Sequence, residues 1–178
     1  SPTNTAEATP KPACRGVPWP SARTVIDTAR RTPFLFKAHS MKKLPITWQR
    51  LVDDTGATCP RCAGTQQEMQ RAVDRLRAAL EPLGVQPVLE TRAMDPATFL
   101  QQPDQSNRIW ISGRPLEDWL GARTGSSRCC DACGDEECRT LEIHGASHEI
   151  IPESLVVQAG LLAASQLLDP TLSSPPAA

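Results

Sequence analysis

The chain has 178 residues, of which 39% are hydrophobic, and this length and composition suit one globular domain with additional segments. Its formal net charge is −1 with both signs intermixed, which gives no sign of a nucleic acid or a membrane surface as partner. No apolar run approaches the roughly 20 residues of a transmembrane helix. The absence of tyrosine and the scarcity of other aromatic residues also disfavour a surface on which bases stack.

The two ends of the chain differ in composition from its middle. Residues 1–40 are rich in Pro, Ala, Thr and Arg and follow no regular period, so they cannot bury enough apolar surface to offset the entropy of ordering. We expect a disordered arm, a tag or a mis-assigned start there, because Met41 stands just before the first clear strand. An organelle transit peptide is the alternative, since this segment is basic. Residues 169–178 are predicted to be a loose tail, which leaves 44–168 as the folded domain.

The apolar periodicity of the middle segment predicts alternating strands and helices. In chain order, these are a strand at 46–52, a helix at 62–83, a strand at 85–91, a short helix at 96–102, a strand at 108–111, two hairpin strands at 140–144 and 148–151, and a helix at 152–168. A strand–helix–strand succession predicts a parallel pair with a right-handed crossover, and we expect the hairpin to complete a mixed sheet with helices on its faces. The last helix is expected to bury Leu155, Val156, Ala159, Leu162 and Ala163.

A Cys-x-x-Cys motif stands where the first strand gives way to the first helix. Cys59 falls at the helix cap, Pro60 at the first helical position and Cys62 inside the first turn. A thiolate at a helix N-terminus faces unpaired N–H groups and the positive end of the helix dipole, and Arg61 adds a nearby positive charge. We therefore expect a lowered pKa at Cys59, which would attack a disulfide, and we expect Cys62 to resolve the mixed disulfide. The alternative is that the pair supplies two ligands of a zinc site.

Two segments of the chain resemble the thioredoxin and glutaredoxin superfamily. They are Thr58-Cys59-Pro60-Arg61-Cys62 after a strand, and Ser106-Asn107-Arg108-Ile109-Trp110-Ile111-Ser112-Gly113. Residues 46–168 are most similar to an uncharacterised prokaryotic thioredoxin-like family, catalogued as a domain of unknown function, with an early Cys-x-x-Cys and a later cysteine-rich loop. The resemblance implies an α/β fold class: a thioredoxin-like mixed sheet flanked by helices, with a Cys-rich loop insertion.

The chain departs from the superfamily pattern just before the third strand. Thioredoxins and glutaredoxins place a cis-proline there, close to the reactive cysteines, whereas this chain has Ser106-Asn107. A cis peptide bond before a residue other than proline costs a few kcal/mol, so we expect a trans bond at this position. The usual way of binding a substrate backbone at the cis-proline is therefore put in question.

A second cysteine cluster follows the third strand. Seven cysteines is many for a domain of this size, and four of them fall within ten residues: Cys129, Cys130, Cys133 and Cys138. Thiolates select soft metals, so a structural zinc site is the leading prediction for this cluster, and a toxic soft metal or metalloid is another. Loop disulfides that relay electrons to the first pair, an iron–sulfur cluster and thiols without a joint role remain alternatives. His144 and His148 flank the hairpin turn and are expected to be solvated more than metal-bound.

Taken together, these features predict a thiol–disulfide redox protein whose catalytic residues are Cys59 and Cys62. The redox pair needs no cofactor, and the second cluster would bind zinc or another soft metal or relay electrons. The partners expected are protein or small-molecule thiols and disulfides, with no nucleic acid and no membrane, and the odd, clustered cysteine count predicts a cytoplasmic location. The alternative is a non-enzymatic cysteine-rich protein that binds zinc or a toxic metal or metalloid.

Overall fold

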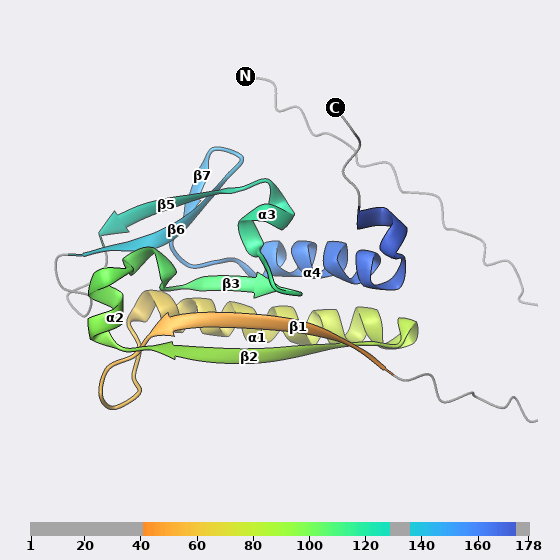
Figure 1. Cartoon of the computed structure of the whole chain (residues 1–178), viewed down its shortest axis with the longest axis horizontal. Helices are drawn as coiled ribbons and strands as arrows, with labels where there is room; N and C mark the ends of the chain where they lie inside the picture. Colours follow the sequence, from red (N-terminus) through yellow and green to blue (C-terminus); the bar gives the residue numbers. More distant parts are fainter. Residues whose placement is uncertain (1–40, 129–135, 174–178) are drawn as a thin grey trace, which may run out of the picture. The chain divides into compact units, whose positions relative to one another are not determined.

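The computed structural model describes residues 41–128 and 136–173. The expectations for residues 1–40, for three of the clustered cysteines and for the end of the tail lie outside these residues. The helices and strands of the described part are shown in Figure 1. In chain order they are β1 (Lys42–Leu51), α1 (Pro60–Leu80), β2 (Val85–Met94), α2 (Pro96–Gln101), β3 (Arg108–Ile111), β4 (Arg114–Pro115), α3 (Leu116–Leu120), β5 (Arg123–Arg128), β6 (Glu137–Ile143), β7 (Ala146–His148) and α4 (Glu153–Leu168).

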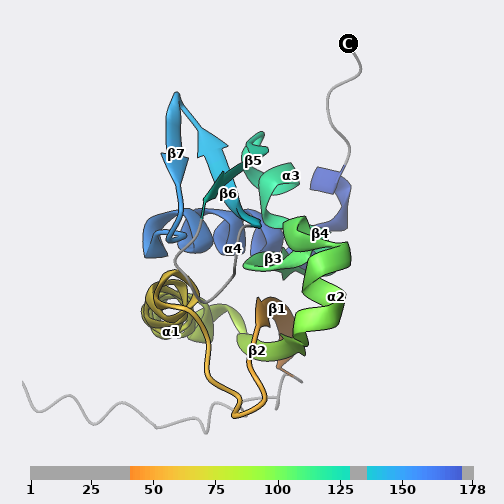
Figure 2. The ribbon, with the colours of Figure 1, turned by 90° about the vertical axis from the view of Figure 1, so that its left-hand side faces the viewer.

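A four-stranded mixed sheet forms the centre of the described part, with the strand order β2-β1-β3-β4. β1 and β2 are parallel along their full length, from Lys42 opposite Val85 to Leu51 opposite Met94. β3 is antiparallel to β1. The predicted strand–helix–strand unit is therefore present, and helices flank the sheet: Figure 2 shows α1 on one side of it and α2 on the other.

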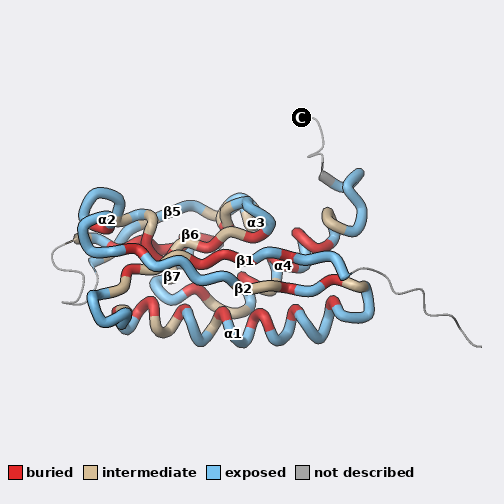
Figure 3. The backbone as a smooth tube through the Cα atoms, turned by 60° about the horizontal axis from the view of Figure 1, so that its bottom comes forward, coloured by how far each residue is buried: buried red, intermediate tan, exposed pale blue. Residues whose placement is uncertain are grey.

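The long helix α1 buries one stripe of side chains against the sheet and α4. The stripe has helical spacing and consists of Thr65, Met69, Ala72, Val73, Leu76 and Leu80. Figure 3 shows this stripe in red on the inner side of the coil, while the outer side is exposed. A short 3-10 turn follows the helix, and Gly84, with a φ of +68°, ends it in the left-handed conformation that glycine adopts without strain.

The C-terminal helix α4 packs on α1 through its small residues. Val156, Ala159 and Ala163 are buried as predicted, together with Gly160 and Ala164. Leu162, which was expected to be buried, is exposed. The helix is apolar on nearly all sides, so periodicity could not distinguish the small buried face from the larger exposed leucines.

The predicted hairpin lies in a separate sheet and does not extend the central one. β5, β6 and β7 form a three-stranded antiparallel sheet in that order. In Figures 1 and 2 this sheet lies above β3, on the side away from β1. The turn between β6 and β7 falls at His144 and Gly145, earlier than the predicted turn at residues 145–147. The strand β5 was not predicted because its sequence, Arg-Thr-Gly-Ser-Ser-Arg, has no apolar alternation.

No helix among the described residues is both long and apolar enough to span a membrane.

Candidate functional site

The two cysteines of the first motif lie together at the start of α1. Cys59 caps the helix, and its Sγ accepts a hydrogen bond from the backbone N–H of Cys62 at 3.5 Å. Pro60 occupies the first helical position, as the sequence predicted. Both side chains are buried, with 4% of Cys59 and 2% of Cys62 exposed. The helix cap therefore places one sulfur at the N–H groups of the first turn and the other one turn further along.

The environment of Cys62 keeps its thiol protonated. The hydrogen bond with the Cys59 side chain, burial and the charge of Cys59 raise the pKa of Cys62 well above its ordinary value of 9.0. The nearby hydroxyl groups of Thr58 and Ser106 act in the opposite direction and lower it. The hydrogen bond with the Cys59 side chain and the charge of Cys59 thus oppose ionisation of the Cys62 thiol.

The hydroxyl groups of Thr58 and Ser106 are held in place by the last residue of β1. Thr58 Oγ1 donates to the carbonyl oxygen of Leu51 at 2.7 Å, and Ser106 Oγ accepts from the N–H of Leu51 at 3.3 Å. The Ser106 hydroxyl proton is then available to the Cys62 sulfur. Leu51 therefore positions both hydroxyl groups beside this thiol.

Asn107 fixes the turn that presents Ser106. Its φ is +56° and its side chain is buried. Its Oδ1 accepts from Trp48 Nε1 and its Nδ2 donates to the carbonyl oxygen of Glu149, both at 3.1 Å. All peptide bonds of the described residues are trans, which confirms the expectation for the Ser106–Asn107 bond.

Arg61 makes contacts that the sequence did not predict. Its side chain is only 8% exposed, and its guanidinium group lies against the end of β5. There it donates to the backbone carbonyls of Ser127 and Arg128, and it forms an ion pair with Glu149 at 3.0 Å. The charge of Arg61 is therefore largely matched by these acceptors.

The second predicted site is only partly within the described residues. Cys129, Cys130 and Cys133 lie outside them, whereas Cys138 lies in β6 opposite Ser127. Cys138 is 3% exposed and belongs to the same hydrophobic core as the first cysteine pair. Across the described residues, no three His, Cys, Asp or Glu side chains are grouped as a metal site requires.

Next to Cys138, the side chain of Arg139 is also buried. It donates to the carbonyl oxygen of Asp104 at 3.2 Å and to Glu117 Oε1 at 2.5 Å. Glu117 in turn lies 3.6 Å from the guanidinium group of Arg108. This ionic cluster joins β6 to β3 and α3, and it explains why the side chain of Glu117 is only 12% exposed.

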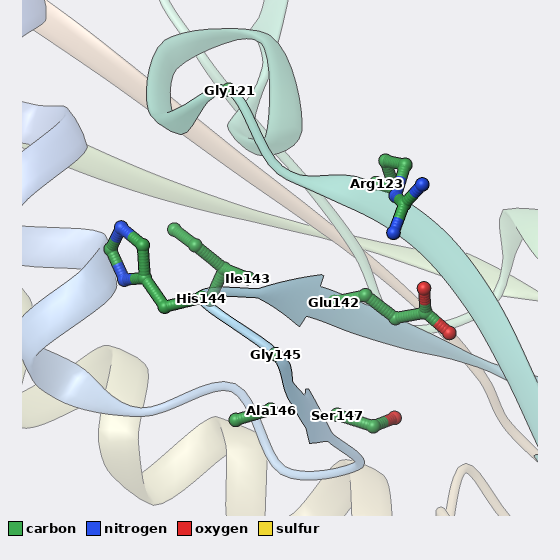
Figure 4. A pocket seen from close by; sticks show the side chains of 8 residues that line it. All are labelled: Gly121, Arg123, Glu142, Ile143, His144, Gly145, Ala146 and Ser147. Atoms are coloured by element: carbon green, nitrogen blue, oxygen red, sulfur yellow. The ribbon is translucent and has the colours of Figure 1, made fainter.

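The hollow around His144 does not gather catalytic groups. It has a volume of about 450 Å³ and lies on the three-stranded sheet. Figure 4 shows the imidazole of His144 directed away from Arg123 and Glu142. His144 is exposed with a φ of +52°, so its side chain extends from the turn into solvent, as the sequence analysis favoured.

Comparison with known proteins places the chain in a family. The model of the family described as a domain of unknown function (DUF2703) matches residues 44–160. The chain belongs to this family. An uncharacterized protein of Archaeoglobus fulgidus is 45% identical over 114 residues, which cover 64% of this chain and 82% of that protein. The comparison with solved structures found no significant match.

Sequence reasoning identified the two thiols but missed the side chains around them. Cys59, Pro60 and Cys62 are recognisable from their spacing and from the helix that follows. Ser106 was recognised only as part of the dipeptide that stands in place of the cis-proline, and Glu149 gave no sequence signal, because its loop meets the motif only in the folded chain. The position of Arg61 between the two cysteines was the one sequence feature that could have indicated its burial. Its hydrogen-bond partners could not be predicted, because they are distant in the sequence.

Proposed function

We propose that this protein is a thioredoxin-like thiol–disulfide redox protein in which Cys59 attacks and Cys62 resolves. The observation that carries the proposal is the cap of α1, where Cys59 accepts the N–H of Cys62 while Cys62 is held protonated. A helix N-terminus favours a thiolate at the cap, and a protonated neighbour keeps its proton until the mixed disulfide has formed. Each step of disulfide exchange thus has its own thiol: Cys59 for the attack on the substrate and Cys62 for the release of the product.

The reaction balances as two successive exchanges. The Cys59 thiolate attacks one sulfur of a substrate disulfide, forms a mixed disulfide and releases the other sulfur as a thiolate. Cys62 then loses its proton and attacks the Cys59 sulfur, which releases the second substrate thiolate and leaves a Cys59–Cys62 disulfide. Two electrons pass from the pair to the substrate, and an external thiol reductant returns the pair to its reduced state.

The topology of the central sheet supports the thioredoxin-like interpretation. With β1 and β2 parallel and β3 antiparallel to β1, the central sheet is mixed and flanked by helices, as the resemblance implies. The motif lies at the β1–α1 junction, where the carboxyl end of a strand meets the N-terminus of a helix. In open α/β sheets this is the edge at which functional sites are found.

The direct test is reduction of a small disulfide by the full chain and its cysteine variants, with a dithiol as the electron source. We expect Cys59→Ser to abolish turnover and Cys62→Ser to form a stable mixed disulfide that mass spectrometry detects. Cys14→Ser is the matched control, because it removes a cysteine that belongs to neither cluster. Turnover that survives Cys59→Ser at the wild-type rate would refute the proposed function.

The second cysteine cluster is proposed to bind a soft metal or to relay electrons. The position of Cys138 supports a link between the two clusters, because it lies opposite Ser127, whose carbonyl oxygen binds Arg61 of the first motif. The same link favours the alternative function, a non-enzymatic metal-binding protein that uses cysteines from both clusters. Thiolate sulfur from six clustered cysteines would suit zinc or another soft ion.

Elemental mass spectrometry of protein purified without oxygen separates these two functions. About one metal ion per chain that is lost in Cys138→Ser, but kept in Cys59→Ser, would assign the ion to the second cluster and leave the redox pair independent. Metal lost in both variants, together with no disulfide turnover in the wild type, would favour the binding protein. No bound metal would favour the electron relay.

A further inference from the structure

The guanidinium group of Arg61 connects the first turn of α1 to the end of a strand in the other sheet. Nη1 donates to the carbonyl oxygen of Ser127 at 3.4 Å, and Nη2 donates to that of Arg128 at 2.9 Å. A planar guanidinium group has five N–H donors and can serve several acceptors at once, which a lysine cannot do in the same geometry. The side chain thus reaches from between the two cysteines to β5.

Glu149 completes this contact from the loop that precedes α4. Its Oε1 lies 3.0 Å from Arg61 Nη2 and accepts the hydroxyl group of Ser127 at 2.8 Å. Its backbone carbonyl accepts from Asn107, which also holds Trp48 of the central strand. We call Arg61, Ser127 and Glu149 the Arg61 contact; it joins α1, β5 and the loop before α4.

The Arg61 contact lies beside the thiol pair. Ser127 pairs with Cys138 and Arg128 with Glu137, so these four residues form the stem where β5 and β6 meet. Figure 1 shows this end of β5 and the start of α1 at the same end of the molecule. Because both thiols of the pair are almost fully buried, a substrate sulfur can approach Cys59 along its S–S axis only if neighbouring groups give way.

The Arg61 contact is built so that it can open. Arg61 is buried, whereas 55% of the Glu149 side chain is exposed, and an ion pair with one partner in solvent is weakened by screening. Opening would leave the carboxylate hydrated and the Ser127 and Arg128 carbonyls free to bind water. The free-energy cost of opening arises mainly from Arg61, because its guanidinium group would lose several charge-assisted hydrogen bonds.

We propose that Arg61 is a positioning residue that fastens the β5–β6 stem beside the cysteine pair and thereby limits access to Cys59. This inference rests on the proposed function in naming Cys59 as the reacting thiol. It assigns Arg61 to substrate access, whereas the sequence alone suggested a charge that stabilises the Cys59 thiolate.

The rate at which iodoacetamide alkylates Cys59 tests this role, measured on the reduced full chain as a function of pH and mapped by tandem mass spectrometry. The rate on the alkaline plateau reports access, and the midpoint of the pH profile reports the pKa of the thiol. We expect Arg61→Met to raise the plateau rate about ten-fold, because bonds to three acceptors are lost. Glu149→Gln should raise it about two- to five-fold, because only the exposed ion pair is weakened.

Arg71→Met is the matched control. Arg71 also lies on α1 and pairs with Glu68 and Glu153, but none of its ion pairs reaches β5. Its plateau rate should equal that of the wild type, and urea unfolding of each variant shows whether alkylation proceeds through global unfolding. If Arg61→Met does not fold, Glu149→Gln decides the outcome.

Two results would overturn the proposal. One is a plateau rate unchanged in the folded variants of both Arg61 and Glu149, and the other is a shift of the midpoint alone, which would make Arg61 an electrostatic group. Neither depends on turnover, because alkylation requires only an accessible thiolate. A chain that fails to reduce disulfides but shows the expected plateau rates would therefore refute the proposed function and leave the access role of Arg61 intact.

Discussion

The backbone N–H of Cys62 points at the Sγ of Cys59, 3.5 Å away. A sulfur that accepts an N–H bond is stabilised as a thiolate, and its charge then opposes ionisation of the second thiol. The two cysteines are chemically alike in sequence, but the first helical turn makes them unequal. The distinct roles proposed for them follow from this inequality.

The first prediction concerns stability at alkaline pH. The folded-state pKa of Cys62 is raised above its unfolded value, so the folded chain keeps a proton that the unfolded chain releases. The stabilisation is fully present below the ordinary pKa of 9.0 and is lost as the pH rises from there toward the folded-state pKa. The contribution of Cys62 to the free energy of unfolding should therefore decrease by up to about 1.4 kcal/mol per pH unit in this range.

Urea unfolding of the reduced wild type and of Cys62→Ala between pH 7.5 and 10 measures this effect. The variant should lose the pH dependence that arises from Cys62 and from its coupling to Cys59, while the cysteines that do not contact Cys62 contribute equally to both proteins. Thiolate absorbance can follow ionisation directly, because the chain contains no tyrosine to absorb in the same region. Equal pH slopes in the two proteins would contradict the raised pKa.

The second prediction concerns Ser106 as a hydrogen-bond donor to Cys62. Ser106→Ala should raise the pKa of Cys62 further, because a group that stabilises the thiolate is removed. Resolution of the mixed disulfide should then slow by roughly three- to ten-fold, since Cys62 must ionise before it attacks. Stopped-flow measurement of thiol release after attack by Cys59 separates this step from the first.

Loss of Ser106 also leaves the N–H of Leu51 without its acceptor, so a cost of about 1–3 kcal/mol in stability is expected. Thr58→Val is the matched comparison, because it removes the other hydroxyl group near Cys62 and a bond to the same residue. Unchanged resolution in a folded Ser106→Ala protein would exclude the hydroxyl group from the reaction.

The third prediction separates two roles of Asn107. Asn107→Ala removes hydrogen bonds to Trp48 and Glu149 and places alanine at a positive φ, so it should cost roughly 2–4 kcal/mol. Asn107→Gly removes the same bonds but tolerates the backbone conformation. It should therefore be less destabilising by about 1 kcal/mol, measured as the difference in the free energy of unfolding. If the glycine variant were the less stable one, the backbone would not be strained at this position.

The fourth prediction tests the close approach of α4 to α1. A Cβ at Gly160 would lie 2.5 Å from Leu76 Cδ1, inside the core. Gly160→Ala should destabilise the fold by about 1–3 kcal/mol despite the better helix propensity of alanine, because the added methyl group would crowd Leu76, which is fully buried. In a Leu76→Ala background the same substitution should cost nothing or stabilise, because the added methyl group enters the space that Leu76 leaves. Additive effects in this double-mutant cycle would show that the two residues do not meet.

The sequence determined those elements whose signals are local. Proline at the first turn of a helix, an apolar stripe at helical spacing and glycine at the helix end predicted α1 together with the position of Cys59 at its cap. Strands β1, β2 and β3 were predicted because their apolar residues follow the period of a strand. In each case the residues that carry the signal lie within a few turns or strand positions of one another, so local propensity and tertiary packing agree.

Only the tertiary structure decided what surrounds the thiols. The polar strand β5 exists because β6 pairs with it, and the two-residue β4 and the short α3 are below the length at which a period can be recognised. The partners of Arg61 lie 66 or more positions away along the chain. Local sequence carries no information on such distant contacts, because they depend on how the two sheets pack, and the environment of the cysteine pair is set by that packing.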